Sequence, residues 1–242
     1  LFQYMGGLLI WFFLLFLLEQ YLASSKNLSY FEKKYFLGYF VILSLFAIVR
    51  IYTNYLPYTL DTKTYLSVAE SISQKNEFYF FGAFLYSSFI YIIQAITFNN
   101  HYAILFTNNF IFIIALIDLL GMVPNNQKKS LWLWSLFLFL YPSIYWFIPN
   151  VLREAVFFLC LVRVLKHSIL IKNSRLISYN SILLVIFSIL CVALRPQVLP
   201  MIYLWVTFML FKKSIFNLIF VLLFGFVLIS NDFMASEYLN KV

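Results

Sequence analysis

Apolar runs of about 20 residues follow one another along the chain, and this repetition constrains its fold more than any other feature. An apolar helix of this length crosses the roughly 30 Å hydrocarbon core of a bilayer, and lipid forces the backbone to pair within the helix. The composition agrees: 64% of residues are hydrophobic and 11% are charged, against about 25% charged in soluble domains. We predict an all-α, polytopic integral membrane helix bundle of about eight or nine segments. The segments lie approximately at 5–22, 35–52, 79–98, 102–120, 131–148, 155–171, 179–194, 198–211 and 214–230.

We expect residues 1–242 to form a single transmembrane domain. Because the chain starts at Leu1 and ends soon after an apolar run, we also expect it to be a fragment of a longer polytopic protein. The first run is longer than the apolar part of a usual signal peptide and has no basic segment before it, so we interpret it as a retained helix.

The basic residues lie in short clusters between the apolar runs, as positive-inside signals do. These clusters account for the net charge of +8. Because the chain shows no separate basic domain, a nucleic-acid partner is disfavoured. The bias predicts that all four clusters are cytoplasmic: Lys26, Lys33 and Lys34; Lys128 and Lys129; Arg163, Lys166, Lys172 and Arg175; Lys212 and Lys213. The connections holding Asp61, the Arg153–Glu154 pair and Arg195 then share the opposite face.

This orientation needs an odd number of crossings between Asp61 and Lys128, yet two apolar runs lie there. We therefore expect 79–98 to be re-entrant, interfacial or broken, because it contains Gly82, Ser87, Ser88 and Gln94. The alternative places Asp61 in the cytoplasm. Residues 53–78 would form an extracytoplasmic loop with an amphipathic helix that rests on the membrane surface. Asp61 would cap this helix, and Leu66, Ala69, Ile72 and Ser73 would share one face.

A first group of candidate site residues comprises Arg50, within Val49-Arg50-Ile51-Tyr52, and then Asp61, Tyr65 and Glu70. A carboxylate just outside the membrane, backed by an arginine at a helix end, can orient an anionic or sugar substrate. An alternative of equal weight is that Asp61 serves only as a helix cap and that the Arg50 side chain only extends to the lipid headgroups.

A second group comprises Arg153 and Glu154, which open an otherwise apolar helix. Local pairing at the helix N-terminus is the simpler account, but ionisable groups at membrane boundaries are costly and usually functional. A third group comprises Arg195 and Gln197, where Pro196 stops a helix. The planar guanidinium of arginine binds phosphate or pyrophosphate through paired hydrogen bonds, although an interfacial anchor explains Arg195 as well.

Other polar residues point to packing. Cys160 and Cys191 lie inside apolar runs and are interpreted as small buried hydrophobes. Asn108, Asn109 and Asp118 are interpreted as polar contacts between helices. We find no cluster with metal-ligand spacing and no glycine-rich phosphate loop, so we predict no metal and no cofactor.

Three segments resemble membrane proteins of polysaccharide assembly. In 47–65, Arg50 at a helix end precedes Asp61 and then Tyr65, four residues on. In 136–155, a Leu/Phe run leads through Tyr141-Pro142 to Leu152-Arg153-Glu154, and 185–203 is similar to a later helix that breaks at a polar residue. Together these resemble the EpsG/Wzy-type polysaccharide polymerases and, more distantly, the multi-spanning GT-C glycosyltransferases. Glu154 stands where many members have Gln, and Arg195-Pro196 stands where members tend to carry His.

The resemblance implies transfer of a sugar or glycan from a polyprenyl-(pyro)phosphate-linked donor on the extracytoplasmic face of a bacterial inner membrane. Arg153 and Arg195 would hold the donor's phosphate, Asp61 or Glu154 would accept the proton of the acceptor hydroxyl, and Tyr65 would support a sugar ring. Partners would be the lipid bilayer, the lipid-linked glycan and other envelope-assembly proteins. The competing class is non-enzymatic, a transporter or a structural subunit, although the sequence shows no internal repeat of the kind many transporters carry.

Overall fold

The computed structural model describes residues 2–25, 28–53, 60–73, 81–98, 100–123, 153–171, 179–199, 201, 202 and 205. Secondary structure in this part of the chain is helical throughout, so the all-α prediction is confirmed for it. The predicted segments 131–148 and 214–230, and most of 198–211, lie outside the described residues. The elements are α1 (Phe2–Ser24), α2 (Tyr30–Thr53), α3 (Leu60–Ser73), α4 (Phe81–Ile96), α5 (His101–Gly121), α8 (Glu154–Ile171), α9 (Tyr179–Leu194) and the short 3-10 helix η2 (Pro196–Val198).

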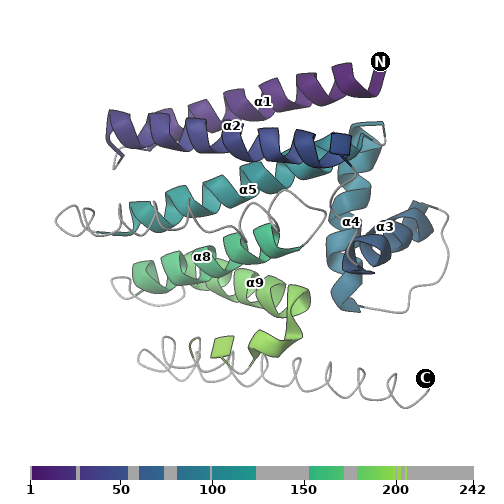
Figure 1. The fold of residues 1–242 in the computed structure, drawn as a ribbon. Coiled ribbons are helices and arrows are strands. Elements are labelled where there is room, and N and C mark those ends of the chain that lie inside the picture. The colour runs from purple at the N-terminus through teal and green to yellow at the C-terminus, as the bar shows by residue number, and fades with distance from the viewer. Residues whose placement is uncertain are drawn as a thin grey trace, which may run out of the picture. The chain divides into compact units, whose positions relative to one another are not determined.

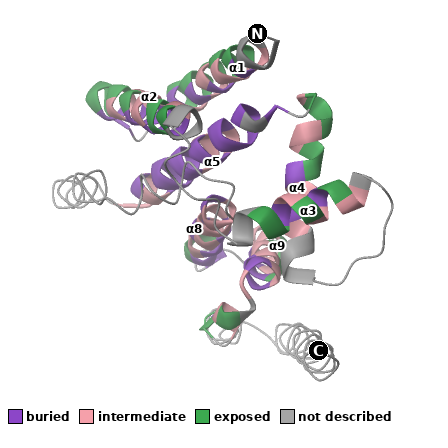
Figure 2. Ribbon diagram, turned by 45° about the vertical axis from the view of Figure 1, so that its right-hand side comes forward, coloured by how far each residue is buried: buried purple, intermediate pink, exposed green. Residues whose placement is uncertain are grey.

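The chain divides into two compact units, Leu1–Val162 and Arg163–Val242, with the boundary inside α8. In the first unit α5 is the central helix: most of its residues are buried, and it packs against α1, α2 and α4 (Figures 1 and 2). The single transmembrane domain expected from the sequence stays a prediction.

Helices α1 and α5 run in the same direction and contact each other near both ends. Gly7 of α1 lies close to Tyr102, so that a Cβ added at Gly7 would be 3.2 Å from the Tyr102 Cβ. At the other end the Tyr21 hydroxyl donates a hydrogen bond to Oδ1 of Asp118, at 2.9 Å. Asp118 therefore forms a polar contact between two helices, as predicted.

Helix α2 starts five residues before the apolar run 35–52 because a capping box precedes that run. The backbone N–H of Ser29 donates to the Glu32 carboxylate, and the N–H of Glu32 donates to the Ser29 hydroxyl at 3.3 Å. This reciprocal pair satisfies N–H groups that the first turn of a helix leaves without backbone acceptors. The helix consequently includes Lys33 and Lys34, and its apolar part is the continuation of a charged first turn.

Two described helices are long and apolar enough to cross a membrane, judged by length and composition. They are Gly6–Ser24 within α1 and Tyr102–Gly121 within α5. The second lies mostly inside the protein, whereas the first exposes a large apolar surface.

Helices α3 and α4 pack against each other beside this bundle, and α4 crosses the direction of α1, α2 and α5 (Figures 1 and 2). Helix α4 has 16 residues, fewer than the roughly 20 of an ordinary crossing. This length agrees with the expectation for 79–98, whose relation to a membrane stays a prediction.

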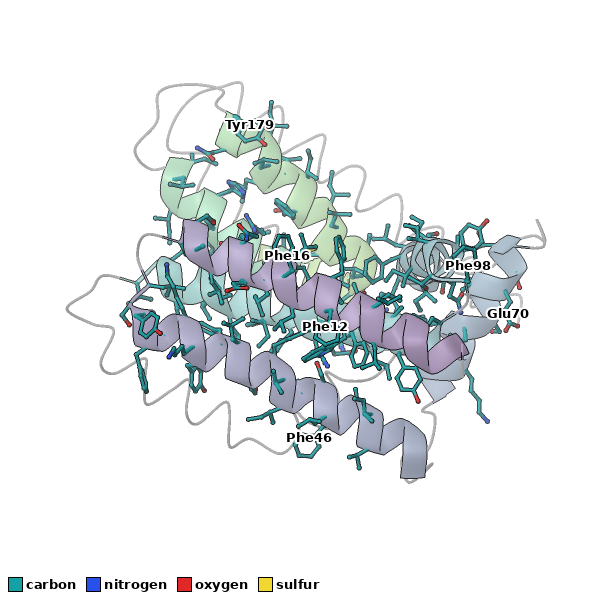
Figure 3. All side chains as sticks on the ribbon, turned by 90° about the horizontal axis from the view of Figure 1, so that it is seen from above. Phe12, Phe16, Phe46, Glu70, Phe98 and Tyr179 are labelled. Carbon is teal, nitrogen blue, oxygen red and sulfur yellow. The ribbon has the colours of Figure 1, made fainter. Side chains whose placement is uncertain are left out.

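Two details of α3 differ from the sequence-based expectation. The helix begins at Leu60, so Asp61 lies in its first turn and not at the cap before it. The apolar face, with Tyr65 and Ala69 at its buried centre, packs against α4. Of the expected face, Ala69 is buried and Leu66 and Ile72 are half-buried, and the buried Tyr65, which the prediction left out, lies on the same side of the helix. Glu70 lies on the exposed side (Figure 3).

In the second unit, the later half of α8 is joined to α9 through buried polar and aromatic contacts. His167 Nδ1 is 3.1 Å from Oδ1 of Asn180, and the imidazole stacks on Phe187 with ring centroids 5.8 Å apart. Ser168 accepts a hydrogen bond from the Trp205 indole at 2.9 Å. Cys160 in the first unit and Cys191 in the second are buried thiols, as predicted.

Candidate functional site

The candidate site is a largely buried cluster in the first unit, in which the start of α8 contacts α3, and α3 is connected through α4 to α5. Its outermost contact joins two residues that are 88 positions apart in the sequence: the guanidinium of Arg153 lies over the Tyr65 ring, 5.9 Å from the ring centroid. A cation in this position is attracted by the negative face of the aromatic ring. Both residues were predicted as site residues from the sequence, and the fold brings them into contact.

Tyr65, for which support of a sugar ring stays a prediction, lies inside the protein. Its side chain is only 3% exposed. One neighbour is Arg153, and another is Tyr86 of α4, whose ring meets the Tyr65 ring edge-to-face at 5.0 Å and 82°. A ring enclosed in this way supports other side chains, and the geometry favours Arg153 as the group that Tyr65 holds.

Tyr86 is the centre of the cluster and is fully buried. Its hydroxyl oxygen accepts a hydrogen bond of 2.8 Å from Nδ2 of Asn108 in α5, which is also fully buried. This bond links α4 to α5 within the apolar interior, where an amide without a partner would cost several kcal/mol by the order of magnitude of transfer measurements. Asn108 thus makes the helix-to-helix polar contact expected of it.

Glu154 is the first residue of α8, as the sequence predicted for a helix opened by a charged pair. The residue is half-buried, and Oε2 of its carboxylate is buried. The positive end of the α8 dipole favours a carboxylate in this turn. The carbonyl of Arg153 accepts from the N–H of Phe157 at 2.9 Å, so Arg153 is the residue from which the helix starts.

The Nε of Arg153 is buried, and no described residue offers it a hydrogen bond. A buried guanidinium nitrogen in an apolar bundle is costly to leave unpaired. Beside it, the N-terminal turn of α8 carries partial positive charge. The arrangement is therefore suited to an anion with several acceptor oxygens, such as a phosphate.

Two other predicted residues, Arg50 and Asp61, are placed by their backbone. Arg50 lies in the last turn of α2, and Asp61 lies one helical turn before Tyr65 on α3. Because α2 runs opposite to α5, the end of α2 that carries Arg50 lies at the end of the bundle where α5 begins. The contacts of these two side chains lie outside the described residues.

Arg195 and Gln197 belong to the second unit. Helix α9 ends at Leu194, and Pro196 opens η2, so the prediction that proline stops the helix is confirmed. Arg195 is half-buried and Gln197 is exposed. Their participation in a site with Arg153 stays a prediction.

Sequence reasoning missed Tyr86 as part of the site. It occurs in Phe84-Leu85-Tyr86-Ser87, one aromatic among many, and nothing local separates it from Tyr91. A signal was nevertheless present: Asn108, an amide in mid-helix, requires a polar partner from another segment.

The part of the chain that the structure describes contains no group of three or more His, Cys, Asp or Glu residues placed to hold a metal ion. No family model, curated protein or solved structure matches this chain.

Proposed function

We propose that this protein is a multi-pass membrane glycosyltransferase of polysaccharide assembly, in which Arg153 binds the phosphate of a polyprenyl-linked sugar donor. The observation that carries the proposal is the Arg153 guanidinium over Tyr65, with its Nε buried, at the positive end of α8. Phosphate is the common biological anion that suits forked arginine donors and a helix N-terminus together. The resemblance of the segments around Asp61 and Arg153 to polysaccharide polymerases supplies the reaction class.

A membrane location is supported by the apolar side chains that the helices leave exposed. On α1 they include Phe12 and Phe16, and on α2 Phe46 points away from the neighbouring helices (Figure 3). Exposed apolar side chains of this size have a lower free energy in lipid than in water, so their exposure favours a membrane environment. We propose that α2, with 24 residues, and the shorter apolar helix α9 cross the membrane besides α1 and α5, in a bundle of about eight or nine segments in a bacterial inner membrane.

In the proposed reaction an acceptor sugar hydroxyl attacks the anomeric carbon of the donor. A new glycosidic C–O bond forms while the bond from that carbon to the polyprenyl (pyro)phosphate breaks, and the phosphate leaves with the bonding electrons. Arg153 stabilises the charge on the leaving phosphate, and Arg195 is a second candidate for this role. The proton of the acceptor hydroxyl passes to the carboxylate of Glu154 or Asp61. Arg50, in the last turn of α2, would help to orient the substrate at the end of the bundle where α5 begins.

The test compares the same substitution at two places in the chain. Arg153→Lys keeps the charge but loses the forked donors, and we expect surface polysaccharide to fall about a hundredfold, the cost of removing a charge-stabilising donor. Arg163→Lys, near the middle of α8, serves as the matched control and should change nothing. Polysaccharide is measured in cells that express each variant at equal abundance in place of the wild type.

The same purified variants are tested for binding of polyprenyl phosphate in phosphatidylcholine nanodiscs. We expect the wild type and Arg163→Lys to bind it and Arg153→Lys to bind more weakly. Normal polysaccharide together with unchanged binding in Arg153→Lys would contradict the proposal and favour a transporter or a structural subunit.

A further inference from the structure

Two residues that the proposed reaction does not use, Tyr86 and Asn108, connect the core of the first unit to its candidate phosphate-binding arginine. They form the inner end of a continuous chain of contacts: Asn108 donates to Tyr86 at 2.8 Å, the Tyr86 ring meets Tyr65 at 5.0 Å, and the Tyr65 ring lies under Arg153. Each contact joins a different pair of helices. The chain of contacts therefore runs from α5 through α4 and α3 to the start of α8.

The inner end of this chain of contacts is rigid. Tyr86 and Asn108 are both fully buried, and the Tyr86 ring is also stacked near Phe89, with ring centroids 5.9 Å apart. A buried side chain in a close-packed interior has one rotamer available, and the hydrogen bond adds a directional constraint on the tyrosine hydroxyl. The fixed position of the Tyr86 ring therefore limits the orientations available to the side chains packed against it.

The outer end is the part that needs orientation. Arginine has a long side chain with much rotamer freedom, and among the described residues the Nε of Arg153 finds no hydrogen-bond acceptor. The face of Tyr65 is thus the described contact that directs the guanidinium. Edge-to-face packing makes the tilt of the Tyr65 ring depend on where Tyr86 is held.

We propose that Tyr86 and Asn108 are positioning residues, which hold the Tyr65 ring in the orientation that directs Arg153. The consequence for phosphate binding rests on the proposed function, whereas the positioning of Arg153 does not.

The experiment uses Tyr86→Phe, which keeps the aromatic ring and removes the hydroxyl oxygen that Asn108 needs. Because this variant removes a hydrogen-bond acceptor from the buried Asn108 amide, the double variant Tyr86→Phe/Asn108→Leu is made as well; replacing both partners by apolar groups relieves the cost of a lost bond. Tyr21→Phe is the matched control, since it also removes a tyrosine hydroxyl from a helix-to-helix hydrogen bond, with Asp118. All variants are studied as the full chain in phosphatidylcholine nanodiscs.

The first measurement is hydrogen exchange at the Nε–H of Arg153 in arginine-labelled protein, with the signal assigned by its loss in Arg153→Lys. Loss of one hydrogen bond of about 1 kcal/mol corresponds to a roughly fivefold change in an equilibrium. We expect exchange to be about fivefold faster in Tyr86→Phe and in the double variant, and unchanged in Tyr21→Phe.

The second measurement is the affinity for polyprenyl phosphate. We expect Tyr86→Phe to weaken binding about fivefold in the wild-type background and to have no further effect in the Arg153→Lys background, because the two residues act as one unit. Equal effects in both backgrounds would mean a general loss of structure and would overturn the proposal. Unchanged Nε–H exchange in both Tyr86 variants would also overturn it. Faster exchange without any lipid-phosphate binding by the wild type would support the positioning role and overturn the proposed function.

Discussion

Arg153 and Glu154 are neighbours in the sequence but have different surroundings in the fold. The Arg153 guanidinium lies over the ring of Tyr65 of α3, whereas Glu154 is the first residue of α8, at the positive end of its dipole. At the residue scale, the cation–π contact gives Arg153 a partner outside its own helix. Local neutralisation of the two charges and a functional role of the pair both stay predictions.

The identity of the proposed base is decided by Asp61→Asn. If Asp61 accepts the acceptor's proton, the amide cannot replace it, and polysaccharide production should fall about a hundred- to ten-thousand-fold. Folded protein should stay near the wild-type amount, because loss of a charge in the first turn of α3 costs only about 0.3–1 kcal/mol. The amounts of polysaccharide and of folded protein are both measured for Asp61→Asn and, in parallel, for Glu154→Gln. A fully active Asp61→Asn protein would transfer the role to Glu154, and activity in both variants would remove general-base catalysis by either carboxylate.

At the scale of the elements, close approach between α1 and α5 depends on small residues. Gly6 and Gly7 face Asn100 and Tyr102, and added Cβ atoms would lie 3.1 Å and 3.2 Å from the nearest of their atoms. Around Gly38 of α2, by contrast, an added Cβ would meet no atom of the other described residues within 4 Å, apart from the nearby backbone of its own helix. A comparison of substitutions at Gly7 and Gly38 therefore distinguishes the effect of packing between helices from the effect of helix propensity.

We expect Gly38→Ala to raise the free energy of unfolding by up to about 1 kcal/mol, the difference in helix propensity between glycine and alanine. Gly7→Ala should gain less, because its Cβ crowds the Tyr102 Cβ, and Gly7→Leu should be less stable than the wild type. The measurement is the thermal unfolding midpoint of each variant in the same detergent. A Gly7→Leu protein as stable as the wild type would contradict the α1–α5 packing described above.

At the scale of the whole molecule, the predicted site residues Arg50, Arg153 and Glu154 lie at one end of the first unit. The last turn of α2, the start of α8 and the first half of α5 lie there, whereas α1 and α5 both end at the opposite side. The positive-inside assignment requires these two sets of helix ends to lie on opposite sides of the bundle. The membrane orientation itself is open to a direct test.

Single cysteines introduced into a Cys160→Ala/Cys191→Ala background test the orientation. We expect an impermeant maleimide to label Thr59→Cys and Gln197→Cys only from outside the cell, because they are on the predicted extracytoplasmic face. Gln127→Cys and Asn173→Cys, beside basic clusters, should be labelled only after the cytoplasmic side is opened. Cytoplasmic labelling of Thr59→Cys would contradict the predicted extracytoplasmic position of Asp61 and of Arg153, which contacts the same helix.

The amino-acid sequence by itself determined the helical class and the positions of most described helices. Apolar runs and their polar interruptions predicted α1, α2, α4, α5, α8 and α9 to within a few residues, since burial of apolar side chains and local backbone pairing depend on nearby residues. It also placed the helix start at Glu154 and the stop at Pro196, because caps and prolines act locally.

Only the tertiary structure decided which of the polar residues meet. Tyr65, Tyr86, Asn108 and Arg153 come from four segments, and their contacts depend on the rotation of each helix about its axis and on the crossing of α4 over α5. Such rotations are set by side-chain packing over the whole interface, where many weak contacts add up. Periodicity within one segment carries no information on them, which is why the central tyrosine of the site, Tyr86, could not be singled out from the sequence.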